Sequence, residues 1–185
     1  KTNLGRFDGL SIDRVFFYGF FPPVQVVGPI IEYDEIQRGG DAWVPPNAED
    51  LLAGAMRIAT GFLKAVVLAG ILQPSGEVFA NAGTAGAPLL WLNLFLYMWF
   101  FYLNFAGYSD LAIGAARMLG FRLKENFCWP YFRRNIAEFW NNWNMSLSRF
   151  AQRNAFVPLG GYRPRTQYLA LLGTIMVIAL WHDIS

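Results

Sequence analysis

The sequence predicts an all-α protein: a multi-pass transmembrane helical bundle with re-entrant and amphipathic interfacial helices. Apolar residues make up 55% and aromatic residues 17% of the 185 residues, but charged residues make up only 15%, against about 25% in soluble domains. The apolar residues form separate runs, and basic residues gather in one stretch between two of them. We expect residues 1–185 to be part of a single membrane domain, as an internal piece of a longer protein.

The first apolar run, residues 15–31, contains three prolines. A regular helix throughout is therefore disfavoured, because proline lacks the N–H that a helix interior needs. A broken or re-entrant segment fits better, since irregular backbone survives at membrane depth only when it is buried in protein. The second run, Leu51–Leu72, follows a polar linker over residues 33–50 and is long enough to cross about 30 Å of hydrocarbon.

Residues 88–106, after a second linker over residues 74–86, are the strongest candidate for a membrane span because Leu, Phe, Trp and Tyr dominate them. The last apolar run, residues 168–181, is shorter, and we expect it to continue past Ser185. His182, the only histidine, closes this run. Ionisable groups near membrane depth usually face a cavity or a substrate path, and an interfacial histidine at a helix end is the alternative.

Residues 135–150 predict one amphipathic helix at the interface or docked on the bundle. Its apolar side chains recur at helical spacing; they are Ile136, Phe139, Trp140, Trp143, Leu147 and Phe150. On such a helix Asn144 falls at the rim of the apolar face.

Two pairs of charged residues are each seven positions apart. They are Arg57 and Lys64 in the second apolar run, and Asp110 and Arg117 in YSDLAIGAAR. Partners at this spacing meet poorly within one helix, so snorkelling or pairing between helices is the alternative to interior pairing. Cys128 is the only cysteine, which excludes a disulfide scaffold. We interpret it as a packed thiol, with an acyl-accepting nucleophile as the alternative.

Four motifs follow one another in the chain: FAGYSD at 105–110, FWNNWN at 139–144, PLGG at 158–161 and ALWHD at 179–183. With them the chain resembles the membrane-bound O-acyltransferase family, most of all its bacterial polysaccharide O-acetylating branch. The resemblance implies an integral, multi-pass enzyme of the bacterial cytoplasmic membrane. Such an enzyme moves an acetyl or other short acyl group from a thioester donor to a hydroxyl of a polysaccharide, glycerol or lipid.

The same resemblance implies acyl-CoA or an acyl carrier protein as donor on the cytoplasmic side, with no bound cofactor. The single histidine and single cysteine argue against a zinc site, and the interleaving of the basic residues with Phe, Trp and Leu favours the positive-inside rule over a nucleic-acid partner. His182 matches the near-invariant histidine of the family, and Asn144 matches its second catalytic position. That position is histidine in the polysaccharide enzymes and asparagine in the lipid- and protein-acylating branches. The substrate or tunnel-lining residues expected from the resemblance are Tyr108, Asp110, Trp140, Trp143 and Trp181.

Two alternatives remain at this point. One is a transporter whose ion path is lined by Asp110, Arg117 and Arg57; it predicts inverted repeats with paired broken segments, whereas one proline-broken segment is visible. The other is a non-catalytic assembly subunit with the same fold, which Asn144 and Asp183 keep open, since both depart from the pattern of the polysaccharide branch.

The charge pattern generates a prediction on topology. Residues 117–165 hold nine Lys or Arg and two acidic residues, so the positive-inside rule puts them on the cytoplasmic side. Single cysteines at Arg122 and Arg163, in a Cys128→Ser background, should resist membrane-impermeant thiol reagents added to intact cells. Ready labelling of either cysteine in intact cells would contradict the predicted orientation.

Overall fold

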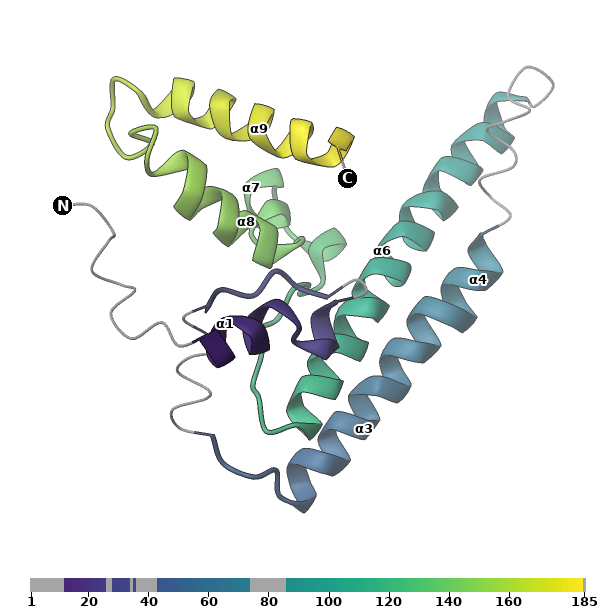
Figure 1. Cartoon of the computed structure of the whole chain (residues 1–185). Helices are drawn as coiled ribbons and strands as arrows, with labels where there is room; N and C mark the ends of the chain where they lie inside the picture. The colour runs from purple at the N-terminus through teal and green to yellow at the C-terminus, as the bar shows by residue number, and fades with distance from the viewer. Residues whose placement is uncertain (1–11, 26–27, 34, 36–42, 74–85, 185) are drawn as a thin grey trace. The chain divides into compact units, whose positions relative to one another are not determined.

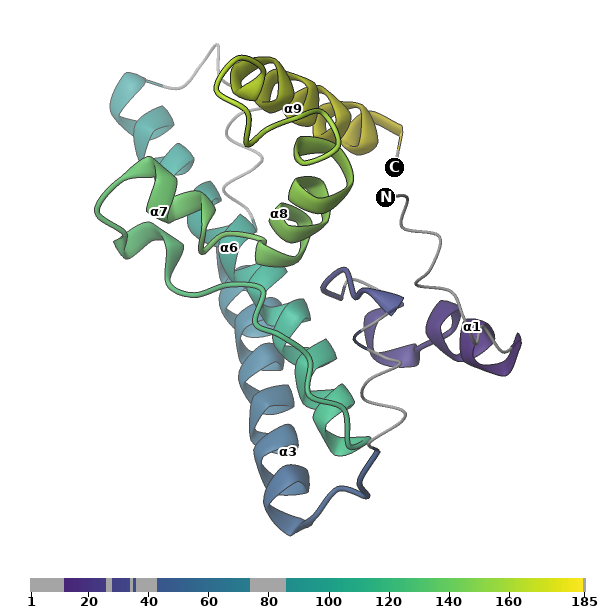
Figure 2. The same ribbon diagram turned by 90° about the vertical axis from the view of Figure 1, so that its left-hand side faces the viewer.

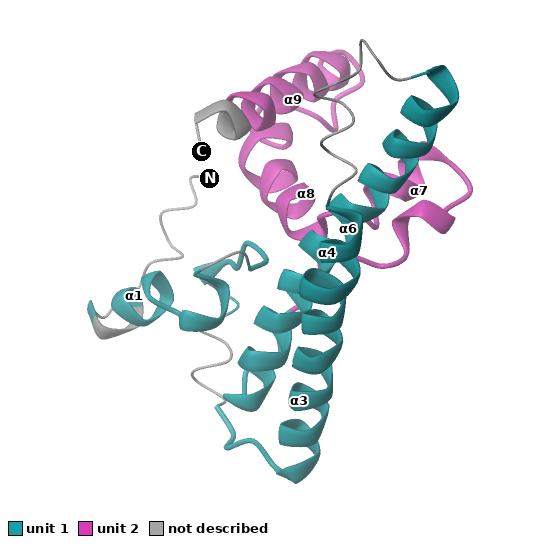
Figure 3. Ribbon diagram, turned by 90° about the vertical axis from the view of Figure 1, so that its right-hand side faces the viewer, with its two compact units in different colours: residues 1–123 teal, residues 124–185 magenta. Residues whose placement is uncertain are grey.

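The computed structural model describes residues 12–25, 28–33, 35, 43–73 and 86–184 (Figure 1). Within these residues all regular secondary structure is helical, which confirms the all-α class. The chain divides into two compact units, residues 1–123 and 124–185 (Figure 3). Most of the two linkers predicted around residues 33–50 and 74–86 lies outside the described residues. A multi-pass bundle stays a prediction.

The proline-rich run begins the first unit. Helix α1 (Ile12–Gly19) ends before the prolines, and a single 3₁₀ turn, η2 (Pro22–Val24), follows. The prediction that this run is not one regular helix is therefore confirmed, whereas a re-entrant path stays a prediction. Phe21, which is completely buried between these elements, packs edge-on against Phe121 with 5.2 Å between ring centroids.

Two helical stretches in the described residues have the length and apolar composition needed to cross a membrane. The first runs through α3 (Ala48–Phe62), the π-helical turns η3 (Leu63–Leu68) and α4 (Ala69–Leu72). It begins at Asn47, whose side-chain oxygen accepts a hydrogen bond from the Asp50 N–H and so caps the helix. The second is α6 (Ala87–Met118), which continues well past the Ala106 expected from the sequence.

Helices α3 and α6 lie antiparallel and side by side (Figures 1 and 2). Glycines make this contact backbone to backbone: a Cβ built on Gly61 would lie 2.6 Å from the Gly107 carbonyl oxygen, and one on Gly114 would lie 2.7 Å from that of Gly54. Small residues allow membrane helices to approach this closely. The extra turns of α6 are thus held by packing against α3.

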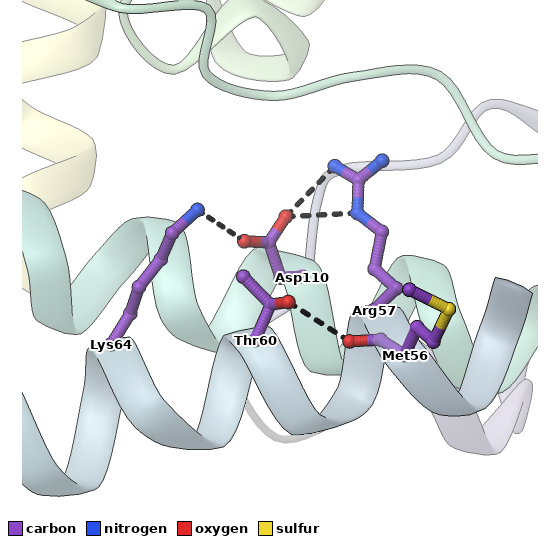
Figure 4. A network of polar contacts seen from close by, with 5 residues as sticks. All are labelled: Met56, Arg57, Thr60, Lys64 and Asp110. Carbon is purple, nitrogen blue, oxygen red and sulfur yellow. Dashed lines mark hydrogen bonds and ion pairs between the residues drawn. The ribbon is translucent and has the colours of Figure 1, made fainter.

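An ion-pair cluster joins the same two helices (Figure 4). The Asp110 carboxylate on α6 accepts hydrogen bonds from Arg57 Nε (3.0 Å) and Nη2 (2.8 Å) and from Lys64 Nζ (2.6 Å) on the α3 side. Its side chain is only 10% exposed. A second pair links Arg117 Nε to Asp50 Oδ1 at 3.1 Å. The sequence alternative of pairing between helices is therefore confirmed.

The second unit corrects the prediction of one amphipathic helix over residues 135–150. The structure instead has α7 (Ile136–Trp140), a four-residue turn, and α8 (Met145–Ala151). The helix is interrupted because Asn144 adopts a left-handed backbone, with φ +41° and ψ 56°. Trp140, expected on the inner face, is exposed.

The rest of the second unit follows α8 directly. The π-helical turns η5 (Gln152–Phe156) extend α8, and after a turn at Gly160 the chain reverses into α9 (Gln167–Ile184). The predicted apolar run at residues 168–181 is confirmed as a helix. A short 3₁₀ turn, η4 (Pro130–Phe132), precedes α7.

The glycine contact predicts that Gly61→Ala destabilises the protein. The new methyl group would overlap the Gly107 backbone, and overpacking of this kind costs about 1–3 kcal/mol. The free energy of unfolding of the full-length protein, measured in mixed micelles with increasing SDS, should fall by that amount. Gly70→Ala in α4, where nothing lies within 4 Å of the new Cβ, is the matched control and should unfold like the parent protein. Equal behaviour of the two variants would contradict the contact.

The ion-pair cluster predicts that Asp110→Asn leaves two cations without their counter-charge. Removing one partner of a fully buried pair costs about 3–5 kcal/mol. We expect about 2–3 kcal/mol here, because Arg57 and Lys64 keep about a third of their side-chain surface exposed. Arg122→Gln, which removes an exposed partner of Asp50, should change the free energy of unfolding by under about 0.5 kcal/mol. A loss at Asp110 no larger than that control would contradict a structural role for the cluster.

Candidate functional site

Asn144 lies in the turn before α8, at the start of that helix. Its side chain is 9% exposed, so it is buried and does not lie at the rim of an apolar face as the sequence suggested. Its carbonyl oxygen accepts the Ser148 N–H (3.1 Å), the first bond of the helix. Its side-chain oxygen Oδ1 accepts a hydrogen bond from the Ser146 hydroxyl at 3.3 Å. The amide nitrogen Nδ2 has no acceptor among the residues that the structure describes.

An aromatic cluster supports this turn. The Trp143 ring stacks on Phe139 (5.5 Å between centroids, 17° between planes) and meets Phe127 edge-on at 5.1 Å. Tyr131 completes the cluster, 5.8 Å from Trp143. Trp140 meets the Phe139 ring edge-on at 5.2 Å and is 56% exposed. Of the three tryptophans expected at the site, Trp143 is therefore fixed next to Asn144 and Trp140 is exposed, whereas the side chain of Trp181 lies outside the described residues.

Helix α9 runs back along η5 and α8 (Figure 1). Leu159 lies against Gly173, near the chain reversal, and residues Val177 and Ile178 lie opposite α8. Because α8 and α9 run in opposite directions in this helical hairpin, the last turn of α9 is at the same end as the first turn of α8. That last turn contains Trp181 and His182. Their side chains lie outside the described residues, so a close approach of His182 to Asn144 stays a prediction.

A cavity of about 270 Å³ lies between these helices in the second unit. Apolar side chains dominate its wall, and the amide of Asn154, its one polar side chain, donates to the Phe150 carbonyl oxygen at 2.9 Å. The full lining is Leu147, Phe150, Ala151, Asn154, Ala155, Pro158, Leu159, Val177 and Ile178. A hydrogen bond made beside such an apolar wall is stronger than the same bond in water.

The remaining expected residues belong to the first unit. Tyr108 is half-buried on α6, and Asp110, two positions later, is buried in the cluster with Arg57 and Lys64 (Figure 4). Asp110 is therefore neutralised by its neighbours. The roles of both residues in lining a substrate path stay predictions.

The sequence reasoning missed two residues beside Asn144. Asn126 and Ser146 are 1% and 2% exposed, and the Asn126 Oδ1 accepts the Ser146 N–H at 3.0 Å. The available signal was a lone asparagine just before an aromatic stretch, FCWPYF. Cys128 is exposed, which corrects the prediction that it is a packed thiol. Its carbonyl oxygen accepts hydrogen bonds from the Arg133 guanidinium.

Comparison with known proteins places this chain in a family. The chain is 32% identical to the probable alginate O-acetylase of Azotobacter vinelandii over 92% of this chain and 34% of the relative. It is 30% identical to the peptidoglycan O-acetyltransferase of Helicobacter pylori, over 92% of this chain and 33% of that protein. The teichoic acid D-alanyltransferase of Bacillus subtilis is 26% identical over 95% of this chain and 48% of its own length.

The chain thus spans about a third of the length of the first of these relatives. The family model of the membrane-bound O-acyltransferases matches residues 6–185, which is nearly the whole chain. Together with the all-helical fold and the membrane-length helices, this match shows that the chain belongs to the membrane-bound O-acyltransferase family.

Proposed function

We propose that the protein to which this chain belongs is an integral membrane O-acyltransferase that uses Asn144 and His182 at one reaction centre. It transfers a short acyl group, such as acetyl, from a thioester donor to a hydroxyl of a polysaccharide, glycerol or lipid acceptor. It works in the bacterial cytoplasmic membrane, and residues 1–185 form part of one membrane domain.

The observation that carries this proposal is the geometry of Asn144. It is a buried amide at the start of α8, its oxygen is held by Ser146, and its nitrogen is left as a hydrogen-bond donor. The antiparallel course of α8 and α9 supports a location of His182, in the last turn of α9, at the same end of the helix pair as Asn144. A hydrogen-bond donor and a base that come together there would meet the needs of acyl transfer.

The chemistry requires both groups. An alcohol is a weak nucleophile at neutral pH, and histidine has the pKa range that suits a general base. In the proposed reaction His182 takes the proton of the acceptor hydroxyl as its oxygen attacks the thioester carbonyl. The carbonyl oxygen becomes an oxyanion, to which Asn144 Nδ2 donates a hydrogen bond. When the intermediate collapses, the carbon–sulfur bond breaks and the thiolate receives the proton from His182.

The relatives support the class of substrate. They are named for the transfer of small acyl groups, acetyl or D-alanyl, and for alginate, peptidoglycan or teichoic acid as acceptors. We therefore favour a short acyl group and a polymer hydroxyl. The second unit is rich in exposed basic side chains, among them Lys124, Arg134, Arg163 and Arg165. Such groups suit the phosphates of coenzyme A or an acidic carrier protein on the cytoplasmic side.

The other expected residues complete the proposed path. Trp143 holds the turn of Asn144 in place, and Trp181 precedes the proposed base in the last turn of α9. Tyr108 and Trp140 would contact the substrate or line the tunnel, and Asp110, with its carboxylate paired to Arg57 and Lys64, would form part of the tunnel lining.

The transporter alternative receives less support. It requires charged groups that are available to a passing ion, yet Asp110 is paired with Arg57 and Lys64, and Arg117 with Asp50. Fixed pairs of this kind stabilise the helix pair. A non-catalytic subunit is distinguished by the experiment that follows.

The proposal predicts a graded series of activities in the purified full-length protein. His182→Ala should lower acyl transfer by at least about 10²-fold, since general-base catalysis contributes about 10²–10⁴-fold. Asn144→Ala should lower it by about 10²–10³-fold, the usual effect of losing one oxyanion donor. Asn144→His should retain partial activity. The measurement is thiol release and ester formation from acetyl-coenzyme A or an acetyl-loaded carrier protein, with alginate oligosaccharides as acceptor.

Cys128→Ser is the control in this series and should leave turnover unchanged, because we assign the thiol no chemical step. Loss of turnover in Cys128→Ser with activity preserved in His182→Ala would replace this mechanism by a covalent acyl-cysteine. A parent protein without transfer from either donor would favour the assembly subunit.

A further inference from the structure

The left-handed turn at Asn144 is held from outside its own helix by Asn126, eighteen positions earlier in the chain. The Asn126 carbonyl oxygen accepts the Met145 N–H at 2.9 Å, and its side-chain Oδ1 accepts the Ser146 N–H at 3.0 Å. These are the first two amides after Asn144, and in a free helix end they would lack partners. One buried asparagine thus caps α8 in place of the Asn144 side chain, which makes no capping bond.

The other side of the turn is held by the same segment. The Cys128 N–H donates to the Asn142 carbonyl oxygen at 3.0 Å, and Phe127 packs edge-on against Trp143. Residues 126–128 therefore contact the chain on both sides of Asn144. This bracket compensates for a positive φ, which residues other than glycine adopt at a cost.

The Asn144 side chain is then free for another task. Because Asn126 supplies the cap, the Asn144 amide need not accept a backbone N–H of its own helix. Its oxygen Oδ1 instead accepts from the Ser146 hydroxyl at 3.3 Å. Nδ2 is left as a donor that can meet a substrate, on a residue that is otherwise largely buried.

We propose that Asn126 and Ser146 are positioning residues for acyl transfer. Asn126 holds the left-handed backbone of Asn144, and Ser146 turns its amide so that Nδ2 points to the thioester carbonyl oxygen. This inference rests on the function proposed above. Neither residue touches the reacting atoms, so each acts through Asn144.

The test uses the purified full-length protein in lipid nanodiscs, with acetyl-coenzyme A and alginate oligosaccharides as probes. Ser146→Ala removes one hydroxyl and keeps the backbone bond to Asn126, so its fold is preserved. We expect its kcat to fall about 10- to 100-fold, since misplacing a reacting group by about 1 Å costs up to about 10²-fold, with KM for the donor within about threefold. Ser148→Ala removes the same hydroxyl from an exposed position of α8 and should keep full kcat.

Asn126 is tested by a pair of substitutions. Asn126→Ala removes the acceptor of the Ser146 N–H and should lower kcat by a similar factor, with faster hydrogen exchange over residues 142–148. Asn126→Asp keeps the acceptor oxygen and should restore most of the activity and the slow exchange. Equal activity of Asn126→Asp and Asn126→Ala would overturn the role of that oxygen.

A double-variant cycle decides whether both residues act through Asn144. In an Asn144→Ala background, Ser146→Ala should lower kcat no further, because the amide that it orients is absent. A further loss equal to that in the parent background would overturn the inference. If Asn144→Ala is impaired but Ser146→Ala and Asn126→Ala are not, only this inference fails. If Asn144→Ala is fully active, the proposed function fails with it.

Discussion

The Asp110 carboxylate lies on a helix that is long enough to cross a bilayer, and two cations of the first unit neutralise its charge. An unpaired charge in hydrocarbon is too costly to persist. Arg57 and Lys64 stand two turns apart on the neighbouring helix and approach Asp110 from either side. They reach it because glycine contacts, Gly61 with Gly107 and Gly54 with Gly114, bring the two backbones together. Charge pairing and close packing therefore specify the same antiparallel register.

The same requirement governs the second unit on a smaller scale. There the groups that need partners are the Met145 and Ser146 N–H groups at the start of α8, and Asn126 supplies the acceptor for each. The consequence differs, however. Asp110 is held by its partners and is saturated, whereas Asn144 is relieved of capping by Asn126 and keeps a donor available. Pairing of this kind explains why one buried polar residue stabilises the fold while another of similar burial is suited to chemistry.

Much of the architecture was predictable from local pattern. The long apolar runs predicted two membrane-length helices, and three prolines predicted the break after Gly19. The full length of α6 was not predicted, because the residues after Ala106 are small and only moderately apolar; their helix is stabilised by contact with α3. The relevant signal was glycines seven residues apart in each helix, Gly54 with Gly61 and Gly107 with Gly114. Its meaning depends on a second helix, which periodicity in one segment does not reveal.

The error at residues 135–150 is of another kind, because the local pattern there was strong and still misleading. Apolar spacing continues across the turn, yet the helix stops where Asn144 takes a positive φ. That conformation depends on hydrogen bonds that the Met145 and Ser146 N–H groups donate to Asn126, which lies outside the segment. A backbone that departs from its own local preference is retained only when the surrounding structure compensates. Such departures concentrate at sites where a side chain must be aimed, and the family resemblance selects this same residue by an independent route.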